Sequence, residues 1–166
     1  KYTYKAEALV PTIAIPAVNV QPSGNIRGAR VEAANRYIYL DTNPNGLSAA
    51  NFKSLVTFAT TNADTVTYEI KNNGSTLGTG DLVPTGAKVT VKASNASGGS
   101  ATVTYTVIIL GDTNSNGRIE SGDATRIALH YAGVRTMTGD ALLAADANRN
   151  GRIESGDAVK ISVKYS

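Results

Sequence analysis

The 166-residue sequence contains no cysteine and no tryptophan, and it has a single histidine and a single methionine. Without cysteine the chain can form no disulfide, no thiolate metal site and no cysteine nucleophile. A small secreted module without disulfides needs another form of stabilisation, and a bound metal ion is one candidate. No apolar run approaches the ~20 residues that a membrane-spanning helix needs, so no membrane partner is expected. The chain begins at Lys1 without a signal peptide, as a mature or excised fragment would.

The chain also lacks a large excess of charge of either sign, because its net charge is only +3. Residues 1–110 hold nine Lys/Arg against six Asp/Glu, and residues 111–166 hold seven of each. The basic residues are scattered, which excludes the patch typical of nucleic-acid binding. His130 has no serine or cysteine nucleophile motif around it, and the acids of residues 1–110 form no pair that indicates a glycosidase. We therefore expect no enzyme activity.

Residues 1–110 have the pattern of short strands joined by turns. Ser48 is expected to cap a helix from Ala49 to about Val56. Four apolar or alternating segments predict strands, at 37–40, 65–70, 87–92 and 101–110. The expected fold class is therefore mixed: a small N-terminal β-sandwich (Ig-like) over 1–110, followed by a small all-α unit over 111–166.

Residues 1–36 leave three interpretations open. Pro11, Pro16 and Pro22 interrupt the apolar stretches, and residues 23–25 read as a turn. This segment is expected to be a linker, a partner-facing arm, or the first strands of the β-rich domain with proline at their edges.

The last third of the chain contains an internal repeat with a 34-residue period. The eight residues 117–124 recur unchanged as 151–158. A helix is expected after each copy, with inward positions Ala124, Ile127 and Tyr131 in the first and Ala158, Ile161 and Tyr165 in the second. Residues 138–145 are expected to form a helix between the copies.

Each copy begins with the pattern D-x-N-x-N-G-R-I-E-S-G-D. Ca²⁺ binds six to eight oxygens, which alternating oxygen side chains on a curled loop can provide, and glycine at position 6 allows the sharp turn. Two Ca²⁺ ions are expected. The expected ligands at positions 1, 3, 5, 7 (carbonyl), 9 and 12 are Asp112, Asn114, Asn116, Arg118, Glu120 and Asp123 in the first loop, and Asp146, Asn148, Asn150, Arg152, Glu154 and Asp157 in the second.

Two features depart from the EF-hand pattern. Position 12 is Asp in both copies instead of the usual bidentate Glu. The segment before the first loop, 101–110, has a strand pattern rather than that of an entering helix. The alternative is an Asn/Gly-rich turn with solvated acids, which two loops in register disfavour. A calcium sensor would need the missing entering helices.

The outward positions of the two loop–helix units have two interpretations: they form a partner surface, or they pack against the rest of the chain. They are Ser121, Gly122, Thr125, Arg126, Ala128 and Leu129 in the first copy, and Ser155, Gly156, Val159, Lys160, Ser162 and Val163 in the second.

At these residues the sequence resembles a dockerin, a family built from two repeats of a Ca²⁺ loop and an exiting helix, with Asp at position 12. The resemblance covers about 111–166. It implies binding to the cohesin module of a scaffoldin or cell-surface anchoring protein, in an extracellular cellulosome-type assembly for polysaccharide degradation. It places the cohesin contacts on the outward positions. Ser-Gly at loop positions 10 and 11 and the apolar helix residues depart from the commonest dockerin class, so the interface is expected to be more apolar.

The region upstream resembles, through its order and spacing, the Ig-like X-modules that accompany some dockerins and brace them. No linker separates Leu110 from Asp112, which fits such packing. The alternative function is a carbohydrate-binding module anchored by the Ca²⁺ unit. Its stacking platforms would come from tyrosines in the first 110 residues, Tyr2, Tyr4, Tyr37, Tyr39, Tyr68 and Tyr105, although the strand patterns favour core packing for several of them.

Overall fold

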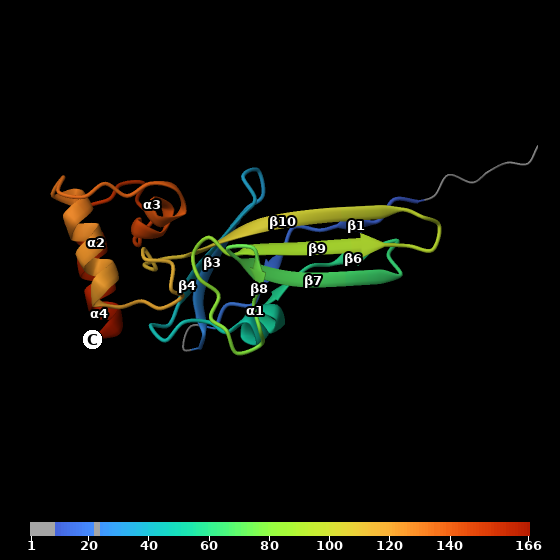
Figure 1. The fold of residues 1–166 in the computed structure, drawn as a ribbon, viewed down its shortest axis with the longest axis horizontal. Helices are drawn as coiled ribbons and strands as arrows, with labels where there is room; N and C mark the ends of the chain where they lie inside the picture. The colour runs from blue at the N-terminus through green and yellow to red at the C-terminus, as the bar shows by residue number, and fades with distance from the viewer. Residues whose placement is uncertain (1–8, 22–23) are drawn as a thin grey trace, which may run out of the picture.

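The computed structural model describes residues 9–21 and 24–166, so the sequence predictions for Tyr2, Tyr4, Pro22 and Ser23 lie outside the described residues. Figure 1 shows an elongated molecule with the strands along most of its length and α2, α3 and α4 together at one end. Within the described residues the strands are β1 (Thr12–Ile13), β2 (Ala17–Val18), β3 (Ile26–Glu32), β4 (Tyr37–Thr42), β5 (Val56–Thr57), β6 (Thr60–Thr61), β7 (Thr65–Asn72), β8 (Ser75–Thr76), β9 (Lys88–Ser94) and β10 (Ser100–Ile109). The helices are α1 (Ala49–Leu55), α2 (Ser121–Tyr131), α3 (Gly139–Ala145) and α4 (Ser155–Tyr165).

Six of the strands form one mixed sheet in the order β3-β4-β10-β9-β7-β8. The β4–β10 pair is parallel, and the other four pairs of this sheet are antiparallel. The remaining described strands pair two by two, β1 with β6 and β2 with β5. The predicted Ig-like β-sandwich is therefore wrong, because one six-stranded sheet stands where two packed sheets were expected.

The reason for this error lies in what covers the sheet. Alternation along a strand predicts that one face is buried but does not say which element buries it. Here the cover includes helix α1, whose Phe52 and Leu55 join the core that contains Ile38 and Val89 of the sheet. Helix α1 and the two-stranded sheets β1-β6 and β2-β5 thus occupy the place of a second large sheet.

Helix α1 confirms the local prediction for its segment. Ser48 is its N-cap, with Oγ accepting a hydrogen bond from Asn51 N at 3.3 Å. Phe52 is completely buried, and the apolar face of this short helix supplies its stability through packing.

The two exiting helices and the connecting helix also form where the repeat predicted them, with α2 packed on α4. The predicted inward face holds for Ile127 and Ile161, which are buried. It is wrong for Tyr131, which is 59% exposed, whereas Tyr165 packs against the core. The end of α4 lies against the sheet region (the described residues before Gly111), where Lys164 contacts Asp41. The sheet region therefore covers Tyr165, whereas Tyr131 has no such cover.

One hydrophobic core crosses the junction between the sheet and the helices. Ile119 and Ile127 belong to the same cluster of buried side chains as Leu47 and Val83 of the sheet region. Directly after β10, Gly111 N donates to Ala144 O of α3 at 2.8 Å. The chain therefore passes from the sheet into the first repeat without a spacer.

None of the helices in the described ranges is long and apolar enough to cross a membrane.

Candidate calcium loops and helix faces

The first loop curls around the side-chain oxygens of its own polar residues. Ser115 and Gly117 have positive φ angles of 60° and 79°, which turn the backbone inward. Asp112 accepts hydrogen bonds from Asn116 N and Gly117 N, both at 3.0 Å. Asn114 Oδ1 accepts from Asn116 N at 3.0 Å. Positions 1 and 3 thus point their oxygens toward the inside of the loop.

The end of the first loop is joined to the start of α2. Asp123 is completely buried, and its Oδ2 accepts a hydrogen bond from Glu120 N at 3.0 Å. Glu120 Oε1 accepts from the side-chain amides of Asn116 at 2.7 Å and Asn114 at 3.3 Å. The acidic side chain at position 12 therefore fixes the first turn of the helix to the loop.

The second loop repeats this geometry. Arg149 and Gly151 have φ angles of 62° and 81° at the positions equivalent to Ser115 and Gly117. Asp146 accepts from Asn150 N at 3.0 Å and from Gly151 N at 2.9 Å. The duplication is thus preserved in individual hydrogen bonds as well as in residues.

The same holds at the end of the second loop. Glu154 N donates to Asp157 Oδ2 at 3.0 Å, and Asn148 N donates to Asp157 Oδ1 at 3.0 Å. Asn150 Nδ2 donates to Glu154 Oε1 at 2.7 Å. α4 is therefore attached to its loop as α2 is to the first.

The two loops differ in burial. Asp112 is completely buried, whereas its counterpart Asp146 is half-buried. Burial raises the pKa of Asp112 to about 6, although three backbone N–H groups that donate to it act in the opposite direction. Burial likewise raises the pKa of Asp123. The first loop thus holds two carboxylates in a poorly solvated place where a cation would compensate their charge.

The donor chemistry of both loops fits a hard cation. Each loop brings two Asp, two Asn, one Glu and a backbone carbonyl to its positions 1 to 12, all of them oxygen donors suited to Ca²⁺. In the described part of the chain, no three acidic, histidine or cysteine side chains gather as a metal cluster. The three predicted carboxylates of each loop are therefore not gathered into such a cluster, and the expected ligand set also includes amide and carbonyl oxygens. The predicted Arg118 and Arg152 are exposed, so their side chains do not obstruct the loop interior.

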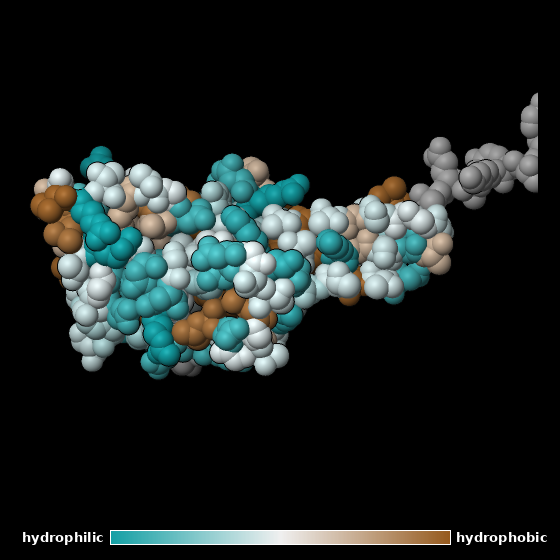
Figure 2. All heavy atoms as spheres, in the orientation of Figure 1, coloured by the Kyte–Doolittle hydropathy of each residue, from teal (hydrophilic) through white to brown (hydrophobic). Residues whose placement is uncertain are grey.

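The predicted contact positions for a partner lie mostly on the surface. Figure 2 shows apolar atoms at the helical end of the molecule. Val159 and Val163 of α4 are 60% and 73% exposed. Exposed with them are Ser121, Gly122, Thr125, Ala128, Ser155, Gly156 and Lys160, while Arg126, Leu129 and Ser162 are half-buried.

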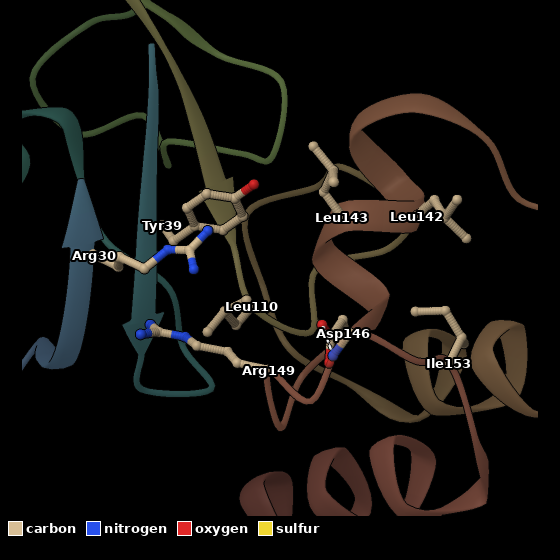
Figure 3. Close-up of a pocket in the computed structure, with 9 residues that line it drawn as sticks. Arg30, Tyr39, Leu110, Leu142, Leu143, Asp146, Arg149 and Ile153 are labelled. Carbon is tan, nitrogen blue, oxygen red and sulfur yellow. Dashed lines mark hydrogen bonds between the residues drawn. The ribbon is translucent and has the colours of Figure 1, made fainter. Parts of the chain in front are cut away.

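A cleft beside the second loop was not predicted. It has a volume of about 390 Å³ and lies between the sheet and the second repeat (Figure 3). Arg30 stacks on the ring of Tyr39, with 4.9 Å from its guanidinium carbon to the ring centre, and Arg149 reaches the same cleft from the loop. Nothing in the sequence pattern brings strand β3 and the second loop together, since the contact depends on how the repeats pack on the sheet.

Of the tyrosines considered for sugar stacking, the four that lie in the described residues are not exposed platforms. Tyr39 and Tyr105 are only 8% and 4% exposed, and Tyr37 and Tyr68 are half-buried. Burial raises the pKa of Tyr68, whose hydroxyl donates to Val56 O at 3.3 Å. These rings pack in and around the core of the sheet region, which removes the support for a carbohydrate-binding surface built on them.

The geometry defines a class of module: two loops with calcium-type ligand spacing, each followed by a helix, with the two helices packed on each other. Strand β10 leads into the first loop, and the short helix α3 leads into the second. Residues 110–163 match the family model of the Dockerin type I domain, which supports a dockerin in this part of the chain. Dockerin domains are protein-interaction modules that bind calcium and cohesin modules, and they are not catalytic. No curated protein and no solved structure matches the chain.

Proposed function

We propose that the chain is a calcium-dependent adhesion unit that attaches its parent protein to a cohesin. The observation that carries this proposal is the dockerin match over residues 110–163, in which both loops repeat the same hydrogen bonds. Two Ca²⁺ ions fill the loops, one each, through the twelve ligands expected from the sequence. Because each loop holds three carboxylates, folding of the helices and binding of the ions are coupled.

The cohesin contacts lie on the outward faces of the two loop–helix units. Support comes from the exposure of Val159 and Val163, which are apolar at positions facing solvent. The partner is the cohesin of a scaffoldin or of a cell-surface anchoring protein. An interface of this kind relies on burial of apolar area at its centre, with Ser155 and Lys160 toward its rim.

Residues 1–110 form a domain that braces the dockerin, as an X-module would. This is supported by the ion pair between Lys164 of α4 and Asp41 of β4, at 2.6 Å, and by the absence of a spacer after β10. The protein acts outside the cell, as dockerin proteins typically do, in a cellulosome-type assembly.

The test is binding of the full chain to a panel of cohesins by surface plasmon resonance, in millimolar Ca²⁺ and in excess EGTA. At least one cohesin is expected to bind in Ca²⁺, and that binding is expected to disappear in EGTA. A variant with both Asp112→Ala and Asp146→Ala should not bind in either buffer. Equal binding in both buffers, or no binding to any cohesin class, would overturn the proposal.

A further inference from the structure

The two loops share their sequence pattern but not their surroundings. Thr85, in the segment between β8 and β9, donates its backbone N–H to Asp112 Oδ2 at 2.8 Å. Among the described residues, the donors to Asp146 both come from its own loop, Asn150 N and Gly151 N. One carboxylate at position 1 is therefore held by the sheet region and the other is not.

Thr85 is itself fixed in place. It is 2% exposed, and its Oγ1 lies 3.1 Å from Ile109 N and 3.2 Å from Ile109 O of β10. These contacts attach the 82–86 segment to the strand that leads into the first loop. The N–H group of Thr85 is thus held rigidly toward Asp112.

The backbones of the two regions also meet closely at the first loop. A methyl group added at Gly46 would lie 2.1 Å from Gly117 O, and one added at Gly117 would lie 2.8 Å from Leu82 Cβ. Ile119 N donates to Pro44 O at 3.0 Å. At Gly151 an added methyl group would meet nothing within 4 Å. The close backbone approach of the sheet region therefore occurs at Gly117 of the first loop and not at Gly151 of the second.

Position 12 shows the same asymmetry. Asp123 Oδ1 accepts from Thr113 N at 2.9 Å, Thr113 Oγ1 at 3.1 Å and Asn114 N at 3.1 Å. Asp157 Oδ1 accepts from Asn148 N at 3.0 Å, and the residue equivalent to Thr113 is Ala147, which has no hydroxyl. More groups orient the carboxylates of the first loop than those of the second.

We propose that the sheet region completes the first calcium site: Thr85 is a positioning residue whose N–H holds the ligand Asp112, so that ion binding in the first loop and packing of the sheet region stabilise each other. In the second loop, Asp146 receives no such donor from the described part of the sheet region, and this loop binds its ion without one. This proposal rests on the proposed function, since it requires that both loops bind Ca²⁺. Partners behind the ligands orient them, and their removal typically weakens metal affinity 10- to 100-fold.

The direct test follows the Thr85 amide by ¹⁵N NMR and hydrogen exchange in full-length variants with one loop disabled. In Asp146→Ala, calorimetry should show one ion bound in the first loop, and filling it should shift the Thr85 resonance and slow exchange of its amide at least tenfold. In Asp112→Ala, the ion bound by the second loop should leave this amide unchanged. If Asp146→Ala binds one ion without affecting Thr85, the inference fails while the proposed function stands. If neither variant binds an ion, the proposed function fails as well.

Substitutions at Thr85 separate the N–H from the hydroxyl. Thr85→Pro removes the donor, and the Kd of the first site, measured with Asp146→Ala, should rise about 10- to 100-fold. Thr85→Val keeps the N–H but loses the hydroxyl contacts to Ile109, and it should raise this Kd by less than Thr85→Pro does. Gly80→Ala, at a glycine where an added methyl group meets nothing within 4 Å, is the control for the segment. Equal losses of calcium affinity in the Pro and Val variants would contradict a role for the N–H. If Thr85→Pro does not fold, the NMR experiment decides.

Discussion

The ion pair between Lys164 and Asp41 gives the sharpest prediction about how α4 is held against the sheet. Their atoms lie 2.6 Å apart, and the Lys164 side chain is only 8% exposed, against 26% for Asp41. Removing one partner of a buried pair costs about 3–5 kcal/mol when the remaining charge stays buried. The cost therefore depends on which partner is removed.

Asp41→Asn leaves the buried ammonium of Lys164 without its anion, and we expect a loss of about 3 kcal/mol in the free energy of unfolding. Lys164→Met leaves a carboxylate that water still reaches, and about 1 kcal/mol is expected. The double variant has no charge to compensate and should lose about 1 kcal/mol, so the coupling energy is about 3 kcal/mol.

The assay is urea denaturation at pH 7 in saturating Ca²⁺, so that the loops remain filled in every variant. The control is Lys71→Met, which removes the exposed Lys71–Glu69 pair on β7 and should change stability by less than about 0.5 kcal/mol. Equal losses from Asp41→Asn and Lys164→Met, with no coupling, would refute the claim that a buried pair braces α4.

Three further predictions concern the loops, the pH dependence and the partner surface. Gly117→Ala should destabilise the Ca²⁺-loaded chain more than Gly151→Ala in thermal unfolding. Both glycines have positive φ, but an added methyl group meets a side chain within 3 Å at Gly117 and nothing within 4 Å at Gly151. Equal effects would contradict the tight packing of the first loop. Burial lowers the pKa of Lys164, so between its folded and unfolded pKa values the unfolded chain binds more protons and stability rises with pH. Lys164→Met should flatten this rise in the wild-type stability curve below pH 10.5, and an unchanged slope would count against the burial. Val163→Asp should weaken cohesin binding at least tenfold without altering the thermal unfolding temperature. Val66→Asp, at an exposed position of β7, should have no effect on binding. Equal affinities for the two variants would show that α4 is not part of the interface.

The local features of the chain could be predicted from the sequence because their causes are local. Gly117 and Gly151 mark the turns of the loops, and the duplicated spacing places α2 and α4. Ser48 marks the start of α1 by its capping oxygen. In each case a residue acts on neighbours within a few positions.

The long-range features could not be predicted in the same way. Alternation in β7 and β9 indicated a buried face, but a single sheet covered by α1 satisfies it as well as two packed sheets do. The contact from Thr85 uses a backbone N–H, which every residue except proline has, so no sequence pattern identifies it. The helical period predicted a buried Tyr131, but this residue lies beyond the elements that cover Tyr165.

Calcium binding by both loops is the central property to measure, and native mass spectrometry of the full chain can count the bound ions. The wild type is expected to carry two Ca²⁺ ions, and Asp112→Ala and Asp146→Ala one each, with the helical circular dichroism signal falling in EGTA. A wild type that carries no calcium, or a single ion that survives both substitutions, would contradict the account.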